Sequence, residues 1–586
     1  MKLARTYFPK INWFIFALIV YFCLSVYSSP RIGLGSGEFN MDISSPFYPL
    51  VVTDIVKDGD VLVDEYAVPV PGFFSGARIN RIGPLEMIRT VVEPEYLLRI
   101  SKAVFPVMKN KYTGALAHYY VNFFNLFGNN KVFLVHFASI FLGAVIIILT
   151  AYLSYLFLGR KVAITCALLL STNPLFIIFK RLPAFPEHFT ELFSIGILTI
   201  LLLFLKTQRN RYFYFLSFLV GLAIYQKVTI FWTLSAIFVI AFVFRLGIKL
   251  RLKQLILGFI FFLIGIFPLI LYNFLDSGTI SFSTSFFLGD DFLKGLTLRI
   301  SDWFGRFIYI FGDPIGFFRY LFYGVRAPAV NYFFYVLLFA SFLFPVFTLL
   351  KKKPWIEQKK VAFFPLLLVL MLFSMSIINR SGFDFTHTFL LVPVVAIVES
   401  TFLVHLLEIL EKIIIKYIKL PFKRYLYFIL IILVLLFQTS QVCEYYFEES
   451  KDSSPVMIMV DAHKELVKYL LNEKITHPVT TNFNLMGIVE FLSQEKVMPI
   501  YYWIVWKDAE VKDNALGRII LKNLNGYYIL KVGFKVDIFN VFPEPSVANF
   551  LEVAEKNNVK PVLLRNIHSR NGTLMFSIYK LGAVNI

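Results

Sequence analysis

Charged residues are scarce in this chain. Only 16% of its 586 residues are Asp, Glu, Lys or Arg, whereas hydrophobic residues make up 58%. Soluble domains are about 25% charged and about 45–50% apolar, so the composition excludes a water-soluble enzyme of this length as well as a disordered chain. Cysteine is scarcer still, with three in total, and Cys23 and Cys166 lie inside apolar runs. No disulfide framework is therefore expected.

Motifs that would couple the chain to ATP or zinc are also missing. The sequence has no Gly-x-x-x-x-Gly-Lys-Ser/Thr phosphate-binding loop, which argues against an ATP-driven pump. It has no Cys/His spacing of the kind that binds zinc.

Apolar runs of nearly 20 residues recur along the chain, and such runs predict membrane-spanning helices. We predict a polytopic α-helical membrane protein with about eleven transmembrane helices. They are expected at residues 11–29, 132–158, 162–179, 189–205, 212–226, 228–244, 255–275, 331–350, 361–378, 389–406 and 425–442. The first run follows three basic residues, but no small-residue cleavage site comes after it. We therefore expect a retained anchor rather than a signal peptide.

Lysine and arginine are unevenly distributed between alternate connections. If the N-terminus is cytoplasmic, the cytoplasmic segments hold 22 of these residues and the short outer connections hold four. Positive residues accumulate on the cytoplasmic side of membrane proteins, so this orientation is predicted. It also accounts for much of the net charge of +19 without a nucleic-acid partner. The protein is expected in the cell (plasma) membrane, surrounded by membrane lipids.

Three outer regions are too long to be turns. The first loop, about residues 30–131, is polar and acid-rich, and the loop at 276–330 is rich in aromatic residues and arginine. Within the second loop, Trp303–Phe311 and Phe317–Tyr323 are predicted to be interfacial or re-entrant helices.

Residues 450–586 are predicted to form a C-terminal extracytoplasmic α/β domain after a transmembrane domain of residues 1–449. Helix-like and strand-like segments alternate there, which is typical of such domains. We expect Leu574–Tyr579 to pair antiparallel with Pro561–Leu564 or its neighbours.

Acidic residues just beyond the first span are candidates for acid–base chemistry. Glu38 and Asp42 come first, and the adjacent pair Asp64-Glu65 follows in the same loop. A carboxylate at a membrane surface can take a proton from an incoming hydroxyl group. The alternative is that these are ordinary solvated loop acids.

The connection between the third and fourth predicted spans is dense in charge. It contains Lys180, Arg181, Glu187 and His188 within nine residues. Charges at membrane depth are costly and usually functional, although long cationic side chains can also merely anchor helix ends.

Three further residues with basic side chains lie in short outer turns. Lys227 follows one predicted span directly, and Arg380 and His387 flank another turn. Together, such groups would bind a phosphate at the membrane surface. Taken singly, each is equally compatible with an interfacial anchor.

Several short motifs resemble those of the membrane-integral GT-C glycosyltransferases. That superfamily includes protein O-mannosyltransferases, lipid A aminoarabinose transferases and the catalytic subunits of oligosaccharyltransferases. The resemblance covers about residues 1–450. The motifs are Lys111-Tyr112-Thr113-Gly114 running to Asn125-Leu126-Phe127-Gly128-Asn129, Asn173-Pro174, Glu187, Gly221-Leu222-Ala223 before Lys227, Pro268 with Asn273 and Gly278, and Thr386–Pro393.

The sequence departs from the family pattern in the first loop, where relatives often carry an adjacent Asp-Glu pair. Here Asp42 is followed by Ile43, and the adjacent pair is Asp64-Glu65. The spacing to the residues that follow favours Asp42, but both positions stay open. The prolines expected around Tyr112-Thr113 are also absent.

The resemblance implies a glycosyltransferase that moves a sugar from a polyprenyl-phosphate donor to a glycan, lipid or protein acceptor on the extracytoplasmic face. Asp42 would be the general base of an inverting reaction, with Glu187 close to the reacting centre. The resemblance implies no certain cofactor, although acids near a phosphate would also suit a divalent cation such as Mg or Mn. Substrate-binding roles fall to Glu38, Asp64, Glu65, Lys180, Arg181, His188, Lys227, Arg380 and His387.

Two other functions compete with this interpretation. A flippase or transporter of lipid-linked saccharides would often show duplicated halves and helices broken at the midplane, and the sequence shows neither clearly. A polysaccharide polymerase or ligase would be expected to carry a large outer loop rich in arginine and histidine. The sequence identifies neither the sugar nor the acceptor.

Overall fold

A computed structural model describes the helical part of the chain most completely. The described residues are 11–26, 80–82, 85–89, 96–100, 103–110, 113–127, 131–182, 185–244, 250–276, 296–323, 332–350, 355–378, 385–417, 426–451, 462–480, 485, 488–489, 492–493, 496–497, 499–501, 516–521, 523–532, 546–569 and 572–583.

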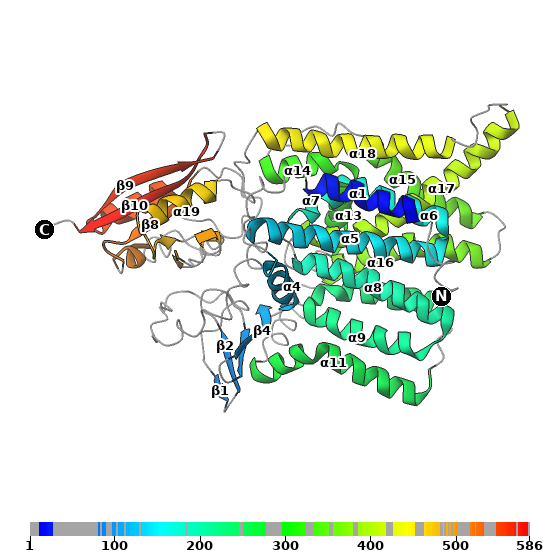
Figure 1. Ribbon diagram of the computed structural model, residues 1–586, viewed down its shortest axis with the longest axis horizontal. Helices are drawn as coiled ribbons and strands as arrows, with labels where there is room; N and C mark the ends of the chain where they lie inside the picture. Colours follow the sequence, from blue (N-terminus) through cyan, green and yellow to red (C-terminus); the bar gives the residue numbers. More distant parts are fainter. Residues whose placement is uncertain are drawn as a thin grey trace.

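The molecule is built around a bundle of apolar helices that run side by side (Figure 1). Each predicted apolar run overlaps helical residues. The helices are α1 (Ile11–Val26), α4 (Leu116–Asn125), α5 (Lys131–Leu158), α6 (Arg160–Thr172), α7 (Pro174–Lys180), α8 (Phe185–Thr207), α9 (Asn210–Gln226), η4 (Val228–Ile230), α10 (Phe231–Val243), α11 (Leu252–Asp276), α13 (Leu296–Gly312), α14 (Pro314–Tyr323), α15 (Tyr332–Leu350), α16 (Trp355–Ile378), η5 (Phe385–Leu391), α17 (Val392–Tyr417) and α18 (Leu426–Lys451).

Among the described residues, four helices are long and apolar enough to cross a membrane. They are Phe133–Leu158, Pro186–Thr207, Leu252–Phe274 and His387–Leu410. The bent pair α6 and α7 makes a fifth if it counts as one span. The chain is thus an integral membrane protein by its apolar helices, whereas the count of eleven spans stays a prediction.

The third predicted span, residues 162–179, is not one straight helix. It breaks into α6 and α7, whose axes differ by 57°. Pro174 lacks the N–H that would continue the helix, and the Asn173 side chain instead accepts a hydrogen bond from the Phe176 N–H at 3.0 Å. This Asn-Pro pair therefore ends one helix and caps the next.

Helices α9 and α11 approach each other very closely. A Cβ atom on Gly221 of α9 would overlap the backbone of Phe262, and one on Gly265 of α11 would overlap the backbone of Phe218. Small residues allow such close contact between helices in a membrane. The Gly221 motif noted in the sequence therefore has a packing role, and it fixes the helix that leads to Lys227.

The segment predicted to be the first outer loop contains a sheet that the sequence analysis did not predict. Five antiparallel strands occur in the order β1-β2-β3-β4-β5. Their bounds are Asn80–Ile82, Leu85–Arg89, Tyr96–Ile100, Ala103–Asn110 and Thr113–Gly114. The last strand runs directly into α4, so the loop enters the bundle through this sheet.

The C-terminal part contains a second five-stranded sheet, in the order β7-β6-β8-β10-β9. Its elements are α19 (Ala462–Asn472), β6 (Val479–Thr480), β7 (Ile500–Tyr501), β8 (Tyr527–Lys531), α22 (Val547–Lys556), β9 (Val559–His568) and β10 (Leu574–Ala583). Neighbouring residues of β8 pack into separate hydrophobic clusters. Ile529 packs with residues of α19, and Tyr528 packs with residues of α22.

The predicted strand pairing in this region is confirmed. Strands β9 and β10 are antiparallel, with Pro561 opposite Leu581 and Leu563 opposite Tyr579. The domain boundary at residue 450 and the extracytoplasmic location stay predictions.

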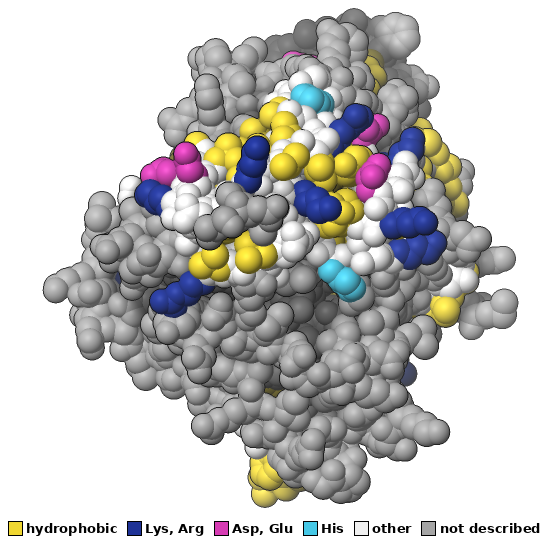
Figure 2. Space-filling view, turned by 90° about the vertical axis from the view of Figure 1, so that its left-hand side faces the viewer, with side chains coloured by type: hydrophobic (Ala, Val, Ile, Leu, Met, Phe, Trp, Pro, Cys, Tyr) yellow, Lys and Arg dark blue, Asp and Glu magenta, His cyan; other side chains and the backbone are white. Residues whose placement is uncertain are grey.

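Both sheets lie at the same end of the helix bundle, which we call the sheet end (Figure 1). The C-terminal part also joins the membrane part there, because Ile488 is buried in a cluster with residues of β4, α4 and α5. Figure 2 views the molecule from this side. On the described residues, lysine and arginine are scattered among apolar and acidic side chains rather than forming one basic surface.

Candidate functional site

Five of the predicted site residues are buried at the sheet end of the bundle. Lys180 and Arg181 lie at the end of α7, Glu187 and His188 lie in the first turn of α8, and Lys227 follows α9. None of these residues is more than 6% exposed. Cationic side chains that anchor helix ends reach toward water, so burial this complete does not fit that alternative.

Lys227 forms an ion pair with Glu187. The backbone of Lys227 also pairs with Thr113 in an isolated β-bridge. The lysine is thus held on one side by α8 and on the other by the last strand of the first outer loop. Two residues that the sequence marked separately are therefore brought together by neighbouring helices.

Tyr225 fastens the first outer loop to the same place. Its hydroxyl accepts a hydrogen bond from the Ala115 N–H at 3.0 Å and donates one to the Val107 carbonyl at 2.7 Å. A Cβ on Gly114 would lie 2.6 Å from the Tyr225 carbonyl oxygen, so only glycine permits this approach. The end of the loop is therefore fixed beside Lys227.

Helix α4 continues from this anchored strand and packs over the site. The Tyr120 hydroxyl donates a hydrogen bond to the Ala138 carbonyl at 2.8 Å. Burial raises the pKa of Tyr120 above its usual range, so the phenol stays protonated as the donor this bond requires.

Lys180 pairs with a glutamate that lies one helical turn after Glu187 on α8, so its partners differ from those of Lys227. It forms an ion pair with Glu191, and its Nζ donates to His188 Nδ1 at 2.9 Å. The Nε2–H of His188 donates to the Leu182 carbonyl at 2.9 Å. With Nδ1 accepting and Nε2 donating, His188 is the neutral Nε2–H tautomer.

The turn after α7 is held by side chains of α5. His136 Nδ1 donates to the Arg181 carbonyl at 2.6 Å, and Ser139 donates to the Leu182 carbonyl at 2.7 Å. These bonds satisfy carbonyl groups that a helix end leaves open. The broken span is thus stabilised where it presents Lys180 and Arg181.

Arg181 packs against an aromatic ring from a distant part of the chain. Its guanidinium carbon lies 4.3 Å from the ring centroid of Tyr446 in α18, which is within cation–π distance. The Tyr446 hydroxyl donates to the Leu24 carbonyl of α1 at 2.5 Å. Three segments therefore meet at Arg181, and one of them leads into the first outer loop.

His387 joins the site region through η5, the 3₁₀ helix before α17. Its ring lies edge-on to Trp232 of α10, with centroids 5.0 Å apart. Two residues further on, Phe389 stacks on Phe179 of α7 at 3.7 Å. The His387 motif therefore contacts both α7 and the start of α10.

The other predicted site residues lie outside the described part of the chain. These are Glu38, Asp42, Asp64, Glu65 and Arg380. The expectation that Asp42 and Glu187 both lie close to the reacting centre therefore stays a prediction.

The described residues do not form a site for a divalent cation. No group of three or more His, Cys, Asp or Glu side chains comes together among them. Glu187 and Glu191 are each paired with a lysine, which leaves them poor ligands for a second cation. A metal ion stays an expectation that concerns the acids of the first outer loop alone.

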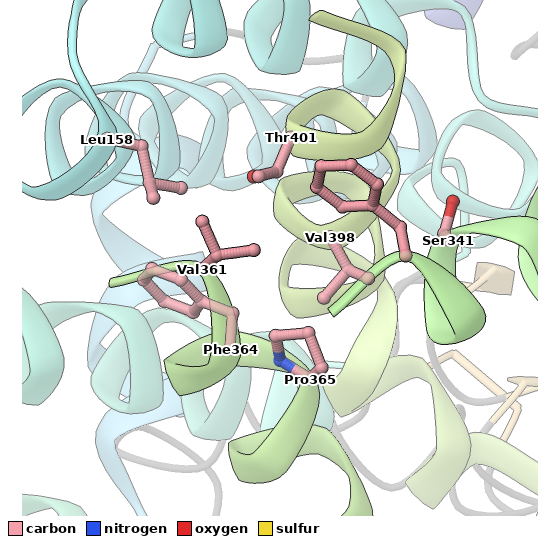
Figure 3. A pocket seen from close by; sticks show the side chains of 8 residues that line it. Leu158, Ser341, Val361, Phe364, Pro365, Val398 and Thr401 are labelled. Atoms are coloured by element: carbon pink, nitrogen blue, oxygen red, sulfur yellow. The ribbon is translucent and has the colours of Figure 1, made fainter. Parts of the chain in front are cut away.

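A narrow pocket among the described residues is lined mainly by apolar side chains (Figure 3). It is lined by Leu158, Ser341, Phe344, Val361, Phe364, Pro365, Val398 and Thr401. The hydroxyls of Ser341 and Thr401 donate to carbonyls of their own helices. Since α5 rises 1.5 Å per residue, Leu158 lies roughly 29 Å beyond Ser139. The pocket thus has no polar group available for chemistry.

Sequence reasoning missed the uncharged residues that organise the site. Tyr225, His136 and Tyr446 all hold backbone or charged groups there. Each lies in an apolar helix and looks like an ordinary core residue. Only Tyr225 had a local signal, because it lies two positions before Lys227 in a tight outer turn.

Comparisons with known proteins concern the sequence of one part of the chain and its fold. Residues 116–272 match the family model described as dolichyl-phosphate-mannose-protein mannosyltransferase. No curated protein matches the chain in sequence. Lys180, Arg181, Glu187, His188 and Lys227 all lie within the matched residues.

Solved structures show the fold. The chain is similar to ArnT from Cupriavidus metallidurans bound to undecaprenyl phosphate, with a TM-score of 0.51, 10% identity and 97% of each chain covered. It is also similar to the apo oligosaccharyltransferase of Archaeoglobus fulgidus, with a TM-score of 0.52, 12% identity, and 97% of this chain and 74% of that chain covered. A complex of the latter enzyme with Zn and sulfate gives a TM-score of 0.54 at 12% identity, with 96% of this chain and 72% of that chain covered. The predicted resemblance is therefore confirmed: in its fold, and in the sequence of residues 116–272, the chain resembles the GT-C superfamily of membrane glycosyltransferases.

Proposed function

We propose that this chain is a membrane glycosyltransferase that moves a sugar from a polyprenyl-phosphate donor to an acceptor hydroxyl on the outer face of the membrane. The observation that carries the proposal is the buried Lys227–Glu187 pair at the sheet end of the bundle. It lies within the residues that match a mannosyltransferase family model. The similar ArnT structure holds undecaprenyl phosphate, which supports a lipid phosphate as part of the donor.

The donor's phosphate would lie against the cations that face the first outer loop. Lys227 is bridged to that loop, and Arg181 packs near the end of α1 that leads into it. A buried cation attracts a phosphate far more strongly than one in water does, and arginine can bind two phosphate oxygens at once. These two residues would fix the phosphate and leave the lipid tail among the apolar helices.

Transfer needs one base and one group that stabilises the leaving phosphate. The acceptor oxygen attacks the anomeric carbon and gives its proton to the carboxylate of Asp42. The bond from that carbon to the phosphate oxygen breaks on the opposite side, so the configuration inverts. The bonding electrons leave with the phosphate, and Lys227 and Arg181 offset the developing negative charge.

Glu187 has a positioning role in this scheme. Its carboxylate is paired with Lys227, so it orients the ammonium group instead of taking the acceptor's proton.

The charge asymmetry of the connections supports an outer location of the site. Both sheets lie at the end of the bundle to which the predicted outer connections belong (Figure 1). A topology reporter fused after residue 450 would be extracytoplasmic under this scheme. A cytoplasmic reporter would contradict it.

The function is tested with purified protein in lipid bilayers and labelled polyprenyl-phosphate sugars. Asp42→Asn keeps the size of the side chain but removes the base, so we expect turnover to fall roughly a hundredfold or more. Donor binding should change much less, because the phosphate is held by cations. Normal transfer by Asp42→Asn together with loss in Asp64→Asn or Glu65→Gln would assign the base to the second acidic pair.

A transport function gives a different result in the same preparation. If no sugar is transferred and lipid-linked saccharides instead cross the bilayer of sealed vesicles, the chain is a flippase. If transfer extends a growing polysaccharide, it is a polymerase or ligase.

A further inference from the structure

Two buried polar side chains beside Lys227 lack hydrogen-bond partners in the part of the chain that the structure describes. Gln226 is 0% exposed, and neither its Oε1 nor its Nε2 has a partner. Trp232 is 3% exposed, and its Nε1–H also lacks one. A buried polar group without a partner costs roughly 1–3 kcal/mol. Three such atoms within seven residues are unfavourable for the fold, and this cost is explained if a ligand forms hydrogen bonds with them.

Neighbouring polar groups show that the region can satisfy such side chains. Thr233, next to Trp232, shares a hydrogen bond with Ser194 at 2.9 Å. Lys227, next to Gln226, has its ion pair with Glu187. Glu191 Oε1 and His136 Nε2, on other elements, also lack a partner among the described residues. Within the connection that carries the site's lysine, the open groups belong to Gln226 and Trp232.

Both residues lie on the short connection between α9 and α10 that contains Lys227. Helix α9 ends at Gln226, η4 spans Val228–Ile230, and Trp232 is the second residue of α10. The Trp232 ring meets the ring of His387 edge-on. The two open side chains therefore flank Lys227 along the chain, and one of them contacts a further residue of the site.

The chemistry of the open groups selects a ligand class. The Gln226 amide offers an acceptor oxygen and two N–H donors, whereas the indole of Trp232 offers one donor. A phosphate only accepts hydrogen bonds at these donors and leaves the amide oxygen open. A hydroxyl group both donates and accepts, so several hydroxyls on one ligand satisfy all three atoms.

We infer that Gln226 and Trp232 bind the hydroxyl groups of the donor's sugar, while the neighbouring Lys227 faces its phosphate. This inference rests on the proposed glycosyltransferase function and assigns a sugar-binding subsite to it. A site that hydrogen-bonds a substrate hydroxyl discriminates strongly against an analogue without it, because its own polar groups are then left unpaired. The two side chains would thus make the site select sugar-loaded lipid over spent lipid phosphate.

Binding measurements on the full chain in nanodiscs test this assignment. The probes are polyprenyl phosphate and the same lipid carrying mannose, glucose, N-acetylglucosamine or arabinose. For each protein, the dissociation constant of the unloaded lipid is divided by that of the best sugar-loaded lipid. Both constants come from one preparation, so a partly unfolded sample leaves this ratio unchanged.

The variants are Gln226→Leu, Trp232→Phe and the control Gln438→Leu. Gln438 is also fully buried, and its Nε2 also lacks a partner among the described residues, but it lies on α18 and accepts a hydrogen bond from Thr172. We expect the ratio to fall about fivefold to tenfold in each of the first two variants, which is the loss of one or two hydrogen bonds. The control should keep the wild-type ratio.

Each other outcome overturns the assignment in a recognisable way. If wild-type protein prefers a sugar-loaded lipid and Gln226→Leu and Trp232→Phe keep that preference, the subsite is wrong and the proposed function stands. If these variants weaken both kinds of lipid equally, the residues support the phosphate region or the fold. If wild-type protein prefers none of the loaded lipids, the proposed function itself fails.

Discussion

Two buried ion pairs on α8 differ in what surrounds them. Glu187 and Glu191 are four residues apart, so they lie on one face of the helix one turn apart. Each binds a lysine from another segment: Glu187 binds Lys227, and Glu191 binds Lys180. Lys180 is also bonded to His188, which in turn holds the Leu182 carbonyl. Lys227 is instead bridged to the first outer loop.

We propose that this difference separates a structural role of Lys180 from a functional role of Lys227. The Lys180 network joins α8 to the end of α7 and the turn after it, although Glu191 Oε1 has no partner among the described residues. The Lys227 pair adjoins a loop with candidate catalytic acids and two side chains whose polar atoms are open. Equal burial and equal charge therefore do not imply equal function, and we expect the two pairs to respond differently to substitution.

Removing each pair as a whole gives the largest expected contrast. Replacing both ions of a buried pair by apolar residues is often nearly neutral for stability, so both double variants should fold. Lys227→Met with Glu187→Leu should lose roughly a hundredfold to a thousandfold in turnover, as expected when a group that stabilises transition-state charge is removed. Lys180→Met with Glu191→Leu should keep most of its turnover. Sugar transfer by the two purified proteins is the measurement.

The contrast would be broken if both double variants lost activity to the same extent. Lys180 would then contribute directly to binding the phosphate. Circular dichroism of both proteins shows whether each is folded.

Single substitutions at the deeper pair should act on stability. Lys180→Met leaves the Glu191 carboxylate buried without its counter-ion, which costs about 3–5 kcal/mol. The expected result is a large fall in the midpoint of thermal unfolding, with most of it restored when Glu191→Leu is added. A second substitution that restores nothing would show that Lys180 acts through His188 rather than through Glu191.

The helical part of the fold could be predicted from the sequence because apolar run length alone defines a membrane helix. The break at Asn173-Pro174 was not predicted, since the run of residues 162–179 is apolar on both sides of it. The sheet of the first outer loop was also missed. Its strands are short, and Leu85–Arg89 and Tyr96–Ile100 each contain charged residues that suggested a solvated loop.

The charged residues of the site could be found from the sequence because charge at membrane depth is rare. The pairing could not be predicted, because Lys227 lies 40 positions from Glu187 and meets it only through helix packing. Tyr225 was marked only by its place two positions before Lys227. Trp232 gave no signal, because a tryptophan at a helix end is common at a membrane interface, and Gln226 gave none because it is a single uncharged side chain. Their roles became visible only in the fold, where Tyr225 has two backbone hydrogen bonds and Gln226 and Trp232 have polar atoms without a described partner.

Tyr225 tests whether the first outer loop must be fixed beside Lys227. Tyr225→Phe removes the hydroxyl that links the Ala115 N–H to the Val107 carbonyl. Leaving these buried backbone groups open should cost about 1–3 kcal/mol. Because the loop end then moves relative to Lys227, turnover should fall more than donor affinity does. Protease cleavage within residues 30–112 should become faster, and an unchanged cleavage rate would show that the sheet is held elsewhere.

Tyr446 should give the smallest effect, because its two contacts can be removed one at a time. Tyr446→Phe loses the hydrogen bond to the Leu24 carbonyl but keeps the ring beneath Arg181, and we expect a loss of about 1 kcal/mol in stability. Tyr446→Leu removes the ring as well and should cost about 0.5–2 kcal/mol more. If Arg181 binds the donor's phosphate, Tyr446→Leu should also weaken binding of polyprenyl phosphate, whereas Tyr446→Phe should not. Equal binding by both variants would mean that the ring supports the helix junction and leaves the orientation of Arg181 to its other neighbours.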